Sequence, residues 1–373
     1  MPGLYIHVPF CAQKCTYCDF YSIVPQARKQ EFVDALIKEI ELRQSFFEEQ
    51  QISSIFFGGG TPSLLSLDQF QKIFSQISAC FFIKNDAEIT IEANPEDLSD
   101  SYIKGLLNLG INRLSIGVQS FIDDDLIALK RSHNSKIAKD AILRAYRLGF
   151  HNISVDLIYG LPFWKKNEWS YNLDQITQLP IQHLSAYHLS FEKGTLLHKQ
   201  REQNKVQETS EALSDLQFKQ LLSFAKDQGF EAYEISNFAK NKMYSKHNLS
   251  YWHRDSYLGL GPSAHSYNAK SRFWNVSNVK QYIESLNVNS LAFEEEKLTE
   301  IDMRNEVLIT NLRTRWGISL DDYKDEFGVN ALENLLQKAE PLINKGLVLN
   351  TKHLKLSEEG VFISDYIMRR LFN

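Results

Sequence analysis

Three cysteines near the start of the chain have the spacing of a metal-binding site. Cys11, Cys15 and Cys18 form the pattern C-x3-C-x2-C directly after a short apolar run. Thiolates are soft ligands that suit zinc, copper(I) or an iron–sulfur cluster. Three thiolates can hold three irons of a [4Fe–4S] cube and leave the fourth iron open, whereas a structural zinc site has four protein ligands. The spacing therefore favours a cluster with one open iron.

The alternatives for these cysteines are zinc and plain burial. His7 precedes them and could serve as a fourth zinc ligand, and unligated cysteines could simply lie in the core. Cys80 stands alone at the end of a predicted helix, and we expect a half-buried core side chain there. Four cysteines in 373 residues are too few for a disulfide scaffold, so the group of three indicates a metal site.

The elements that would position the cysteines alternate between strand and helix six times. We predict strands at 4–8, 54–57, 88–93, 113–118, 153–159 and 183–189. We predict helices at 30–47, 67–81, 102–109, 136–148, 168–179 and 209–228. Repeated strand–helix order implies a parallel sheet with right-handed connections, and six units are too few for a complete eight-fold barrel. We expect an α/β fold with a partial (βα)6 barrel; a flat doubly wound sheet is the alternative.

Polar and glycine residues follow several of the predicted strands. Glycines such as Gly59 and Gly60, next to Thr61, let backbone groups approach a small charged ligand closely. The other candidates at strand ends, or in the loops after them, are Glu92, Gln119, Arg131 and Asp156. Ligands of such folds bind at the carboxyl ends of the strands, so we expect these side chains to surround one site. Taken singly, each could be an ordinary surface or capping residue.

The pattern changes after the sixth unit. We expect a barrel at 1–240, an irregular connecting region at 241–297, and a smaller α+β, winged-helix-like domain at 298–373. Packing against the barrel is the simpler role for the last part. Its helix at 330–345 balances Glu333 and Glu340 with Lys338 and Lys345 and presents no basic face. We therefore expect no nucleic-acid partner.

Composition is that of a globular protein. Hydrophobic residues make up 43% and charged residues 23%, and 41 basic against 46 acidic residues give a net charge of −5. A net negative charge argues against a protein surface that binds nucleic acid broadly. No apolar run reaches the ~18 residues of a membrane span, and the first residues lack the pattern of a signal peptide. We expect a cytoplasmic protein; peripheral membrane association is left open.

The cysteine spacing, at the end of a first strand in a strand–helix barrel, resembles the radical S-adenosylmethionine superfamily over residues 1–240. The resemblance implies that the open iron binds the methionine moiety of S-adenosylmethionine and that the cluster delivers an electron to the sulfonium. It implies a methionine-binding loop at Gly59, Gly60 and Thr61. It also implies contacts near the cofactor for strand-end side chains and two tyrosines, namely Glu92, Gln119, Arg131, Asp156, Tyr5 and Tyr17.

Within the superfamily, the chain is similar to the oxygen-independent coproporphyrinogen III oxidase family. The similar segments are YIHVPFC, GGGTP and GVQS. The frame is shared by the oxidase, which decarboxylates two propionates of a tetrapyrrole, and by a haem-chaperone branch. Three features favour the chaperone branch: Phe20 stands where the oxidase has a further cysteine, the first strand begins at about residue 4 without the oxidase's N-terminal arm, and His247 opens an H-N-x-x-Y-W motif.

The H-N-x-x-Y-W motif has a plausible chemistry. An imidazole such as that of His247 is a common axial ligand of haem iron, and Tyr251 and Trp252 offer flat faces for a porphyrin. The alternative is a loop that packs on the core. Rival haem ligands are His188 and His265, and less favourably His183 and His253.

The resemblance implies a chain that binds haem and transfers it to an unidentified acceptor protein, with a [4Fe–4S] cluster and S-adenosylmethionine. The alternative is an enzyme, an oxygen-independent coproporphyrinogen III dehydrogenase, which Phe20 and the missing arm disfavour. A nucleic-acid-modifying radical enzyme is the third hypothesis, and the acidic net charge argues against it.

Overall fold

Residues 3–297 are organised around one mixed sheet of twelve strands. The structure is a computed structural model that describes residues 2–24, 26–49, 51–162 and 168–372. The strand order is β12-β11-β10-β9-β1-β2-β3-β4-β5-β6-β8-β7. The strands are β1 (Gly3–Val8), β2 (Gln51–Gly59), β3 (Phe82–Ala93), β4 (Arg113–Gln119), β5 (Ile153–Tyr159), β6 (His183–His188), β7 (Glu231–Ala232), β8 (Asn237–Ala239), β9 (Tyr257–Leu260), β10 (His265–Tyr267), β11 (Ser271–Asn275) and β12 (Phe293–Lys297). The seven neighbours from β9 through β1 to β6 run parallel.

Helices follow each of the first six strands, so the six predicted strand–helix units are confirmed. They are α1 (Lys29–Leu42), α2 (Leu67–Cys80), α3 (Asp100–Asn108), α4 (Asp123–Ala128), α5 (Ser135–Leu148), α6 (Glu168–Thr177), α7 (Leu196–Glu202) and α8 (Glu211–Asp227). None of the helices in the described ranges combines the length and apolar character that a membrane span requires.

Helix α2 illustrates why these segments fold as they do. Ser66 and Gln69 form a capping box at its start, which satisfies backbone N–H groups that have no partner inside the helix. Phe70, Phe74 and Ile77 recur at helical spacing and are buried. The same spacing on the other helices provides the apolar faces that cover the sheet.

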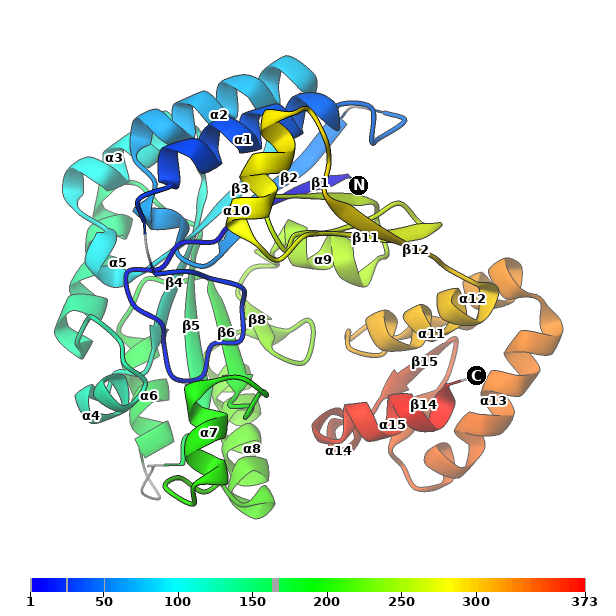
Figure 1. Cartoon of the computed structure of the whole chain (residues 1–373). Coiled ribbons are helices and arrows are strands. Elements are labelled where there is room, and N and C mark those ends of the chain that lie inside the picture. Colours follow the sequence, from blue (N-terminus) through cyan, green and yellow to red (C-terminus); the bar gives the residue numbers. More distant parts are fainter. Residues whose placement is uncertain (1, 25, 50, 163–167, 373) are drawn as a thin grey trace.

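The helices of these units cover one face of the sheet. Phe57 of β2 is fully buried and packs edge-on against Phe70 and Phe74 of α2. Figure 1 shows α1, α2, α3 and α5 on this outer side of the strands. A doubly wound sheet carries helices on both faces, so the partial barrel is confirmed and the flat sheet is excluded.

The register brings the carboxyl ends of the parallel strands to one edge. Val8 at the end of β1 pairs with Gly59, and Glu92 of β3 pairs with Ser115 of β4. Gly117 in turn lies opposite Asp156 of β5. The sequence-predicted polar residues therefore surround the same end of the barrel.

The prediction of an irregular region at 241–297 is wrong in detail. This part contains α9 (Lys246–Trp252), the four strands β9 to β12 and α10 (Val279–Asn287). Strand β9 adds a seventh parallel strand beside β1, and β10 to β12 extend the sheet as antiparallel strands. The four strands have only three to five residues each, which is too short for a periodic pattern to stand out.

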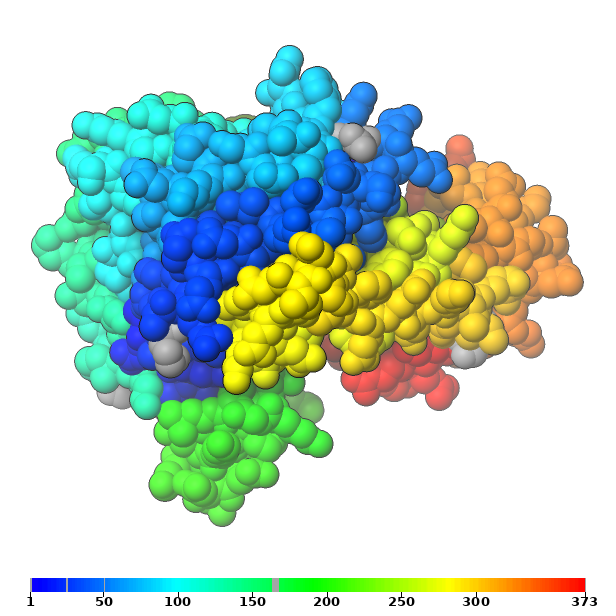
Figure 2. Space-filling model, turned by 45° about the horizontal axis from the view of Figure 1, so that its top comes forward, coloured from blue at the N-terminus to red at the C-terminus, as the bar shows by residue number. Residues whose placement is uncertain are grey.

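The C-terminal part has its own small sheet and its own core. Its elements are α11 (Glu300–Asn311), β13 (Ile318–Ser319), α12 (Leu320–Phe327), α13 (Val329–Asn344), β14 (Val348–Asn350), β15 (His353–Leu356), α14 (Glu358–Phe362) and α15 (Ser364–Leu371). Strands β14 and β15 form an antiparallel hairpin, and β13 pairs with the other side of β15. A second hydrophobic cluster that includes Leu308, Leu335 and Leu354 holds these elements together. Figures 1 and 2 show this part, coloured orange and red, beside the sheet extension.

Candidate functional site

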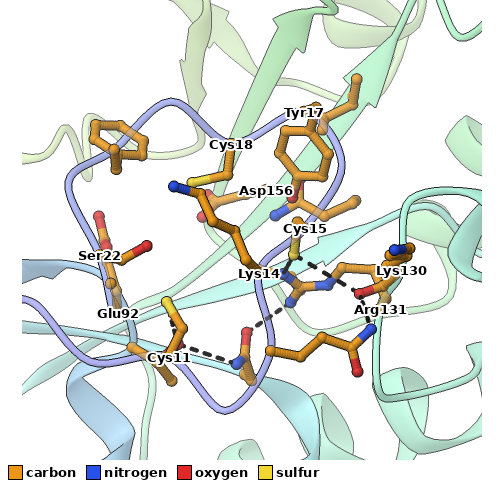
Figure 3. Close-up of a pocket in the computed structure, with 18 of the residues that line it drawn as sticks. Cys11, Lys14, Cys15, Tyr17, Cys18, Ser22, Glu92, Lys130, Arg131 and Asp156 are labelled. Atoms are coloured by element: carbon orange, nitrogen blue, oxygen red, sulfur yellow. Dashed lines mark hydrogen bonds between the residues drawn. The ribbon is translucent and has the colours of Figure 1, made fainter. Parts of the chain in front are cut away.

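The three clustered cysteines line one cavity at the carboxyl end of the strands. They lie in the loop after β1, and all three thiols are free. The loop is held by backbone hydrogen bonds from Cys11 to Ile23, at 3.0 Å, and from Thr16 to Leu129, at 3.2 Å. The cavity has a volume of about 390 Å³. Figure 3 shows the cysteines around one space with Glu92, Arg131, Asp156 and other lining residues.

Two polar side chains contact the thiols. The Thr61 hydroxyl donates to Cys11 Sγ at 3.6 Å, and the Arg131 Nη1 donates to Cys15 Sγ at 3.4 Å. N–H and O–H donors beside sulfur stabilise a thiolate over a thiol. Cys80 lies elsewhere, at the end of α2, where it is buried beside Gln76.

The donor set fits an iron–sulfur cube better than a single ion. No three His, Cys, Asp or Glu side chains of the described residues converge tightly enough to hold one metal ion. His7 is hydrogen-bonded through both ring nitrogens, to the Tyr5 hydroxyl and to the Tyr21 carbonyl. It therefore offers no free nitrogen as a fourth zinc ligand. Three thiols around a shared space are the set that ligates three corners of a cube.

The glycines after β2 create close approaches that a larger residue would block. A Cβ on Gly60 would lie 2.7 Å from both the Val8 and the Phe10 carbonyl oxygens. Gly59 has φ +101°, and a Cβ there would lie 2.6 Å from the His7 ring. Gly60 and Thr61 donate backbone hydrogen bonds to Val8 and Phe10. The end of β2 is thereby tied to the start of the cysteine loop.

Two half-buried carboxyl groups face the cavity from β3 and β5. Glu92 accepts a hydrogen bond from the Gly59 N–H at 3.2 Å, and burial, together with the nearby Asp156, raises the pKa of Glu92 to about 8. Asp156 accepts from the Ser115 hydroxyl at 3.1 Å, and burial raises its pKa as well. A ligand that carries hydroxyl donors or positive charge would stabilise both carboxylates.

Arg131 joins several walls of the cavity. Its Nη2 donates to the Asn94 side chain at 2.6 Å and to the Gly117 carbonyl at 2.7 Å. Its Nε is buried without a hydrogen-bond partner among the described residues. Burial disfavours the charge, but Tyr17 and Cys15 raise the pKa of Arg131, so the guanidinium stays charged. A charged donor with one unpartnered N–H fits an anionic group of a bound ligand.

Gln119 lines the cavity from an unusual backbone conformation. Its φ is +69°, in the left-handed region, and a β-bulge interrupts the pairing of β4 with β5 between Gly117 and Gln119. Bulges re-aim side chains beside functional sites. Tyr17 also lines the cavity, whereas Tyr5 does not. Tyr5 is half-buried on β1, and its hydroxyl is hydrogen-bonded to His7 Nδ1 at 3.1 Å.

Several lining residues were not predicted as site residues from the sequence. They include Lys14, Ser22, Asn94, Ser115, Lys130 and Tyr187, as well as His188, which the sequence indicates only as a rival haem ligand. Ser115 lies two residues before Gly117, and Tyr187 lies two residues after Ser185. Side chains at this spacing face the same side of a sheet, so a correct strand register predicts that Ser115 and Tyr187 face the barrel interior. The residues of the loops give no comparable signal.

His247 lies outside this cavity. It is 1% exposed, and its ring nitrogens are hydrogen-bonded to the Ser54 hydroxyl at 3.0 Å and the Tyr251 hydroxyl at 2.8 Å. Burial and the charge of Arg113 lower its pKa to about 3, so the ring is neutral. Iron ligation by His247 requires one of these hydrogen bonds to break, and its haem role stays a prediction.

The aromatic residues of the same motif line a second cavity. Tyr251 and Trp252 border a space of about 280 Å³ between α9, the sheet extension and α11. Arg272 and Glu306 also line it and pair with one another. This space is lined by none of the residues that line the cysteine cavity.

Comparisons with known proteins place this geometry in a family. A model described as the Radical SAM superfamily matches residues 5–175, and a model described as the HemN C-terminal domain matches residues 298–363. A Bacillus subtilis protein named "Heme chaperone HemW" is 32% identical over 98% of both chains. The chain belongs to the HemW family. Another HemW relative, from Mycobacterium tuberculosis, is 30% identical over 99% of this chain and 94% of its own.

Further relatives have other names. A Bos taurus protein named "Radical S-adenosyl methionine domain-containing protein 1, mitochondrial" is 30% identical over 100% of this chain and 87% of its own. The solved structure of coproporphyrinogen III oxidase (HemN) from Escherichia coli superposes with a TM-score of 0.87, covering 100% of this chain and 90% of that chain, at 23% identity. The HemW family therefore shares its fold with that oxidase, and the fold alone does not assign the activity.

Proposed function

We propose that the chain is a haem chaperone, which binds haem and passes it to an acceptor apoprotein in the cytoplasm. The observation that carries the proposal is the near full-length similarity to proteins named "Heme chaperone HemW", at 32% identity over 98% of both chains. The H-N-x-x-Y-W motif and the single bulky Phe20 in place of a further cysteine add support.

The chain would carry a [4Fe–4S] cluster on Cys11, Cys15 and Cys18. Superfamily membership supports the cluster, and so does the lining of one cavity by three free thiols. When bound, the cluster supplies an open iron for S-adenosylmethionine and an electron for its sulfonium. Thr61 and Arg131 would stabilise the thiolates that ligate it.

The same cavity would hold S-adenosylmethionine. Arg131 would pair with the carboxylate of the methionine moiety, because it keeps its charge and has an unpartnered N–H. The backbone near Gly59 and Gly60 would accommodate the amino-acid end, and Gln119 and Tyr17 would complete the wall. Glu92 and Asp156 would accept hydrogen bonds from hydroxyl groups, such as those of ribose.

The second candidate is an oxygen-independent coproporphyrinogen III dehydrogenase. The observation in its favour is the superposition on the Escherichia coli oxidase with a TM-score of 0.87. Phe20 argues against it, because this 61% exposed ring lines the cavity at the position where the oxidase family has a cysteine. The lower identity of 23% to that enzyme, against 32% to the HemW relative, argues in the same direction.

The experiment that tests the proposal is a haem-transfer measurement. Reconstituted protein is titrated with haem, separated from the excess, and mixed with apomyoglobin as a haem sink. We expect one haem per chain at saturation and movement of that haem to apomyoglobin, both followed by the Soret band. Absence of stoichiometric haem binding, or haem that apomyoglobin cannot remove, would contradict a chaperone.

A further inference from the structure

His188 occupies a distinctive position at the mouth of the cysteine cavity. It is the last residue of β6 and, in the described part of the chain, the one histidine that lines this cavity. Its Nε2 is hydrogen-bonded to the buried Ser214 hydroxyl of α8 at 2.9 Å. The ring lies edge-on against Tyr159, with centroids 5.2 Å apart, and above Gly160, where a Cβ would be 2.7 Å from Nε2. These contacts fix the orientation of the imidazole.

The second ring nitrogen of His188 is available. Within the described residues, its Nδ1 makes no hydrogen bond, whereas both nitrogens of His183 and His247 are engaged by buried hydroxyl groups. Burial lowers the pKa of His188, so its ring is neutral at pH 7. A neutral imidazole with one nitrogen anchored and the other free is the arrangement of a metal-ligating histidine.

The neighbours of His188 suit a flat apolar ligand with negative groups. Tyr187, 44% exposed, and Phe20, 61% exposed, line the same cavity and present aromatic faces. Lys14 and Lys130 line it as well and supply positive charge. A porphyrin ring packs on aromatic faces, its propionates pair with ammonium groups, and its iron takes an imidazole nitrogen.

We propose that His188 Nδ1 is the axial ligand of the haem cargo, which would sit at the mouth of the cysteine cavity between Phe20 and Tyr187. The inference rests on the proposed haem-binding function and adds the location of the cargo. The Ser214 hydroxyl is then a positioning group, because it holds the ring from the far side. Cargo and cluster would share one opening, and His247 lies outside it, packed against Phe56 on the inner face of β2.

The test is a haem titration of the full-length protein and of five variants, read from the Soret band. His188→Gly should weaken haem binding at least ten-fold, and free imidazole should restore the wild-type spectrum. His188→Met should keep haem with a shifted Soret band, because a thioether replaces the imidazole. Ser214→Ala should weaken haem binding roughly ten- to a hundred-fold, as loss of a group that orients a metal ligand does. His151→Ala is the matched control, since this exposed histidine between α5 and β5 lies outside both cavities.

The outcomes separate the inference from the function on which it rests. If the wild-type protein binds no haem, the proposed function fails. If the wild-type protein binds haem while the His188 variants keep its affinity and spectrum, the inference is wrong and the function stands. Loss of haem in His247→Gln alone, with iron content and circular dichroism unchanged, would likewise overturn His188 as the ligand and favour the H-N-x-x-Y-W motif.

Discussion

At the scale of residues, the thiols of the loop after β1 carry the first prediction. Replacing Cys11, Cys15 or Cys18 by Ala should abolish the cluster, because each thiolate would ligate a different iron of the cube. Cys80→Ala is the control and should leave iron content normal, since Cys80 is buried at the end of α2. Anaerobic reconstitution followed by iron analysis and visible absorption measures both. Loss of iron in Cys80→Ala alone would overturn the ligand assignment.

Arg131 carries a second prediction about the cofactor. Arg131→Met should weaken S-adenosylmethionine binding by about ten- to a hundred-fold, because a charge-assisted hydrogen bond contributes about 1.5–3 kcal/mol. Arg147→Met is the control, since that side chain is 70% exposed on α5. Calorimetric titration of reconstituted protein gives the affinity. Iron content is checked first because Arg131 also contacts Cys15. Unchanged affinity would remove Arg131 from the cofactor site.

The raised pKa of Glu92 leads us to predict that the free energy of unfolding depends on pH. Its pKa is raised to about 8 by burial and by Asp156, so the folded protein holds this proton more tightly than the unfolded chain does. The resulting stabilisation is complete at pH values below about 4.5 and is lost as pH rises towards 8. A pKa shift of this size contributes at most about 4–5 kcal/mol to the free energy of unfolding.

Urea denaturation of wild-type protein and Glu92→Gln, without cofactors, measures this effect between pH 5 and pH 8. We expect the free energy of unfolding of the wild type to fall relative to the variant across that window. Parallel curves for the two proteins would mean that Glu92 keeps an ordinary pKa.

Residue types and spacing predict many of the side chains that line the candidate site. The cysteines, Glu92, Arg131 and Asp156 line one cavity, because parallel strands bring their carboxyl ends together. Tyr5 does not line it, since its ring stacks with Phe56 and His247 instead. The direction in which a strand side chain points depends on how its strand pairs with its neighbours. That pairing joins residues far apart in the sequence, so the local sequence does not predict it.

At the scale of elements, one buried carboxylate makes several of the contacts that hold α9 to the barrel. Glu88 of β3 accepts hydrogen bonds from the Lys246 and His247 N–H groups at 3.1 and 3.2 Å, and from the Ser245 hydroxyl at 3.3 Å. A negative charge at a helix N-terminus is favourable, and Glu88 also lies 3.9 Å from the buried Arg113. The H-N-x-x-Y-W motif is therefore anchored to the inner wall of the barrel.

Glu88→Gln should reduce the free energy of unfolding by about 3–5 kcal/mol, because it leaves the buried Arg113 charge without its partner. Asp86→Asn is the matched control on the same strand: Asp86 pairs with Lys246 of the same helix but is exposed, so we expect little change. Urea denaturation compares the two variants. Equal effects would show that the anchor of α9 lies elsewhere.

The long elements could be predicted from sequence and the short ones could not. The helix at 67–80 has a capping box and four buried apolar residues at helical spacing, which together determine its bounds closely. Strands β9 to β12 have three to five residues each, and they form because β1 and one another offer unpaired edges. These short strands are stabilised by tertiary pairing, so no local sequence pattern predicts them.

At the scale of the whole molecule, the chain combines a radical SAM domain with near full-length similarity to proteins named as haem chaperones. Its fold superposes on the Escherichia coli oxidase at a TM-score of 0.87, while its near full-length identity is higher to a protein named "Heme chaperone HemW". The fold leaves two activities to distinguish for this chain, oxidation of coproporphyrinogen III and the proposed transfer of haem.

One anaerobic sample decides between these activities most directly. Reconstituted protein with S-adenosylmethionine and a reductant is given haem and coproporphyrinogen III in equal amounts, and the tetrapyrroles are then separated by chromatography. We expect one haem bound per chain and coproporphyrinogen III recovered with all its propionates. Conversion of two propionates to vinyl groups, with no haem retained, would contradict the account and identify a decarboxylating enzyme.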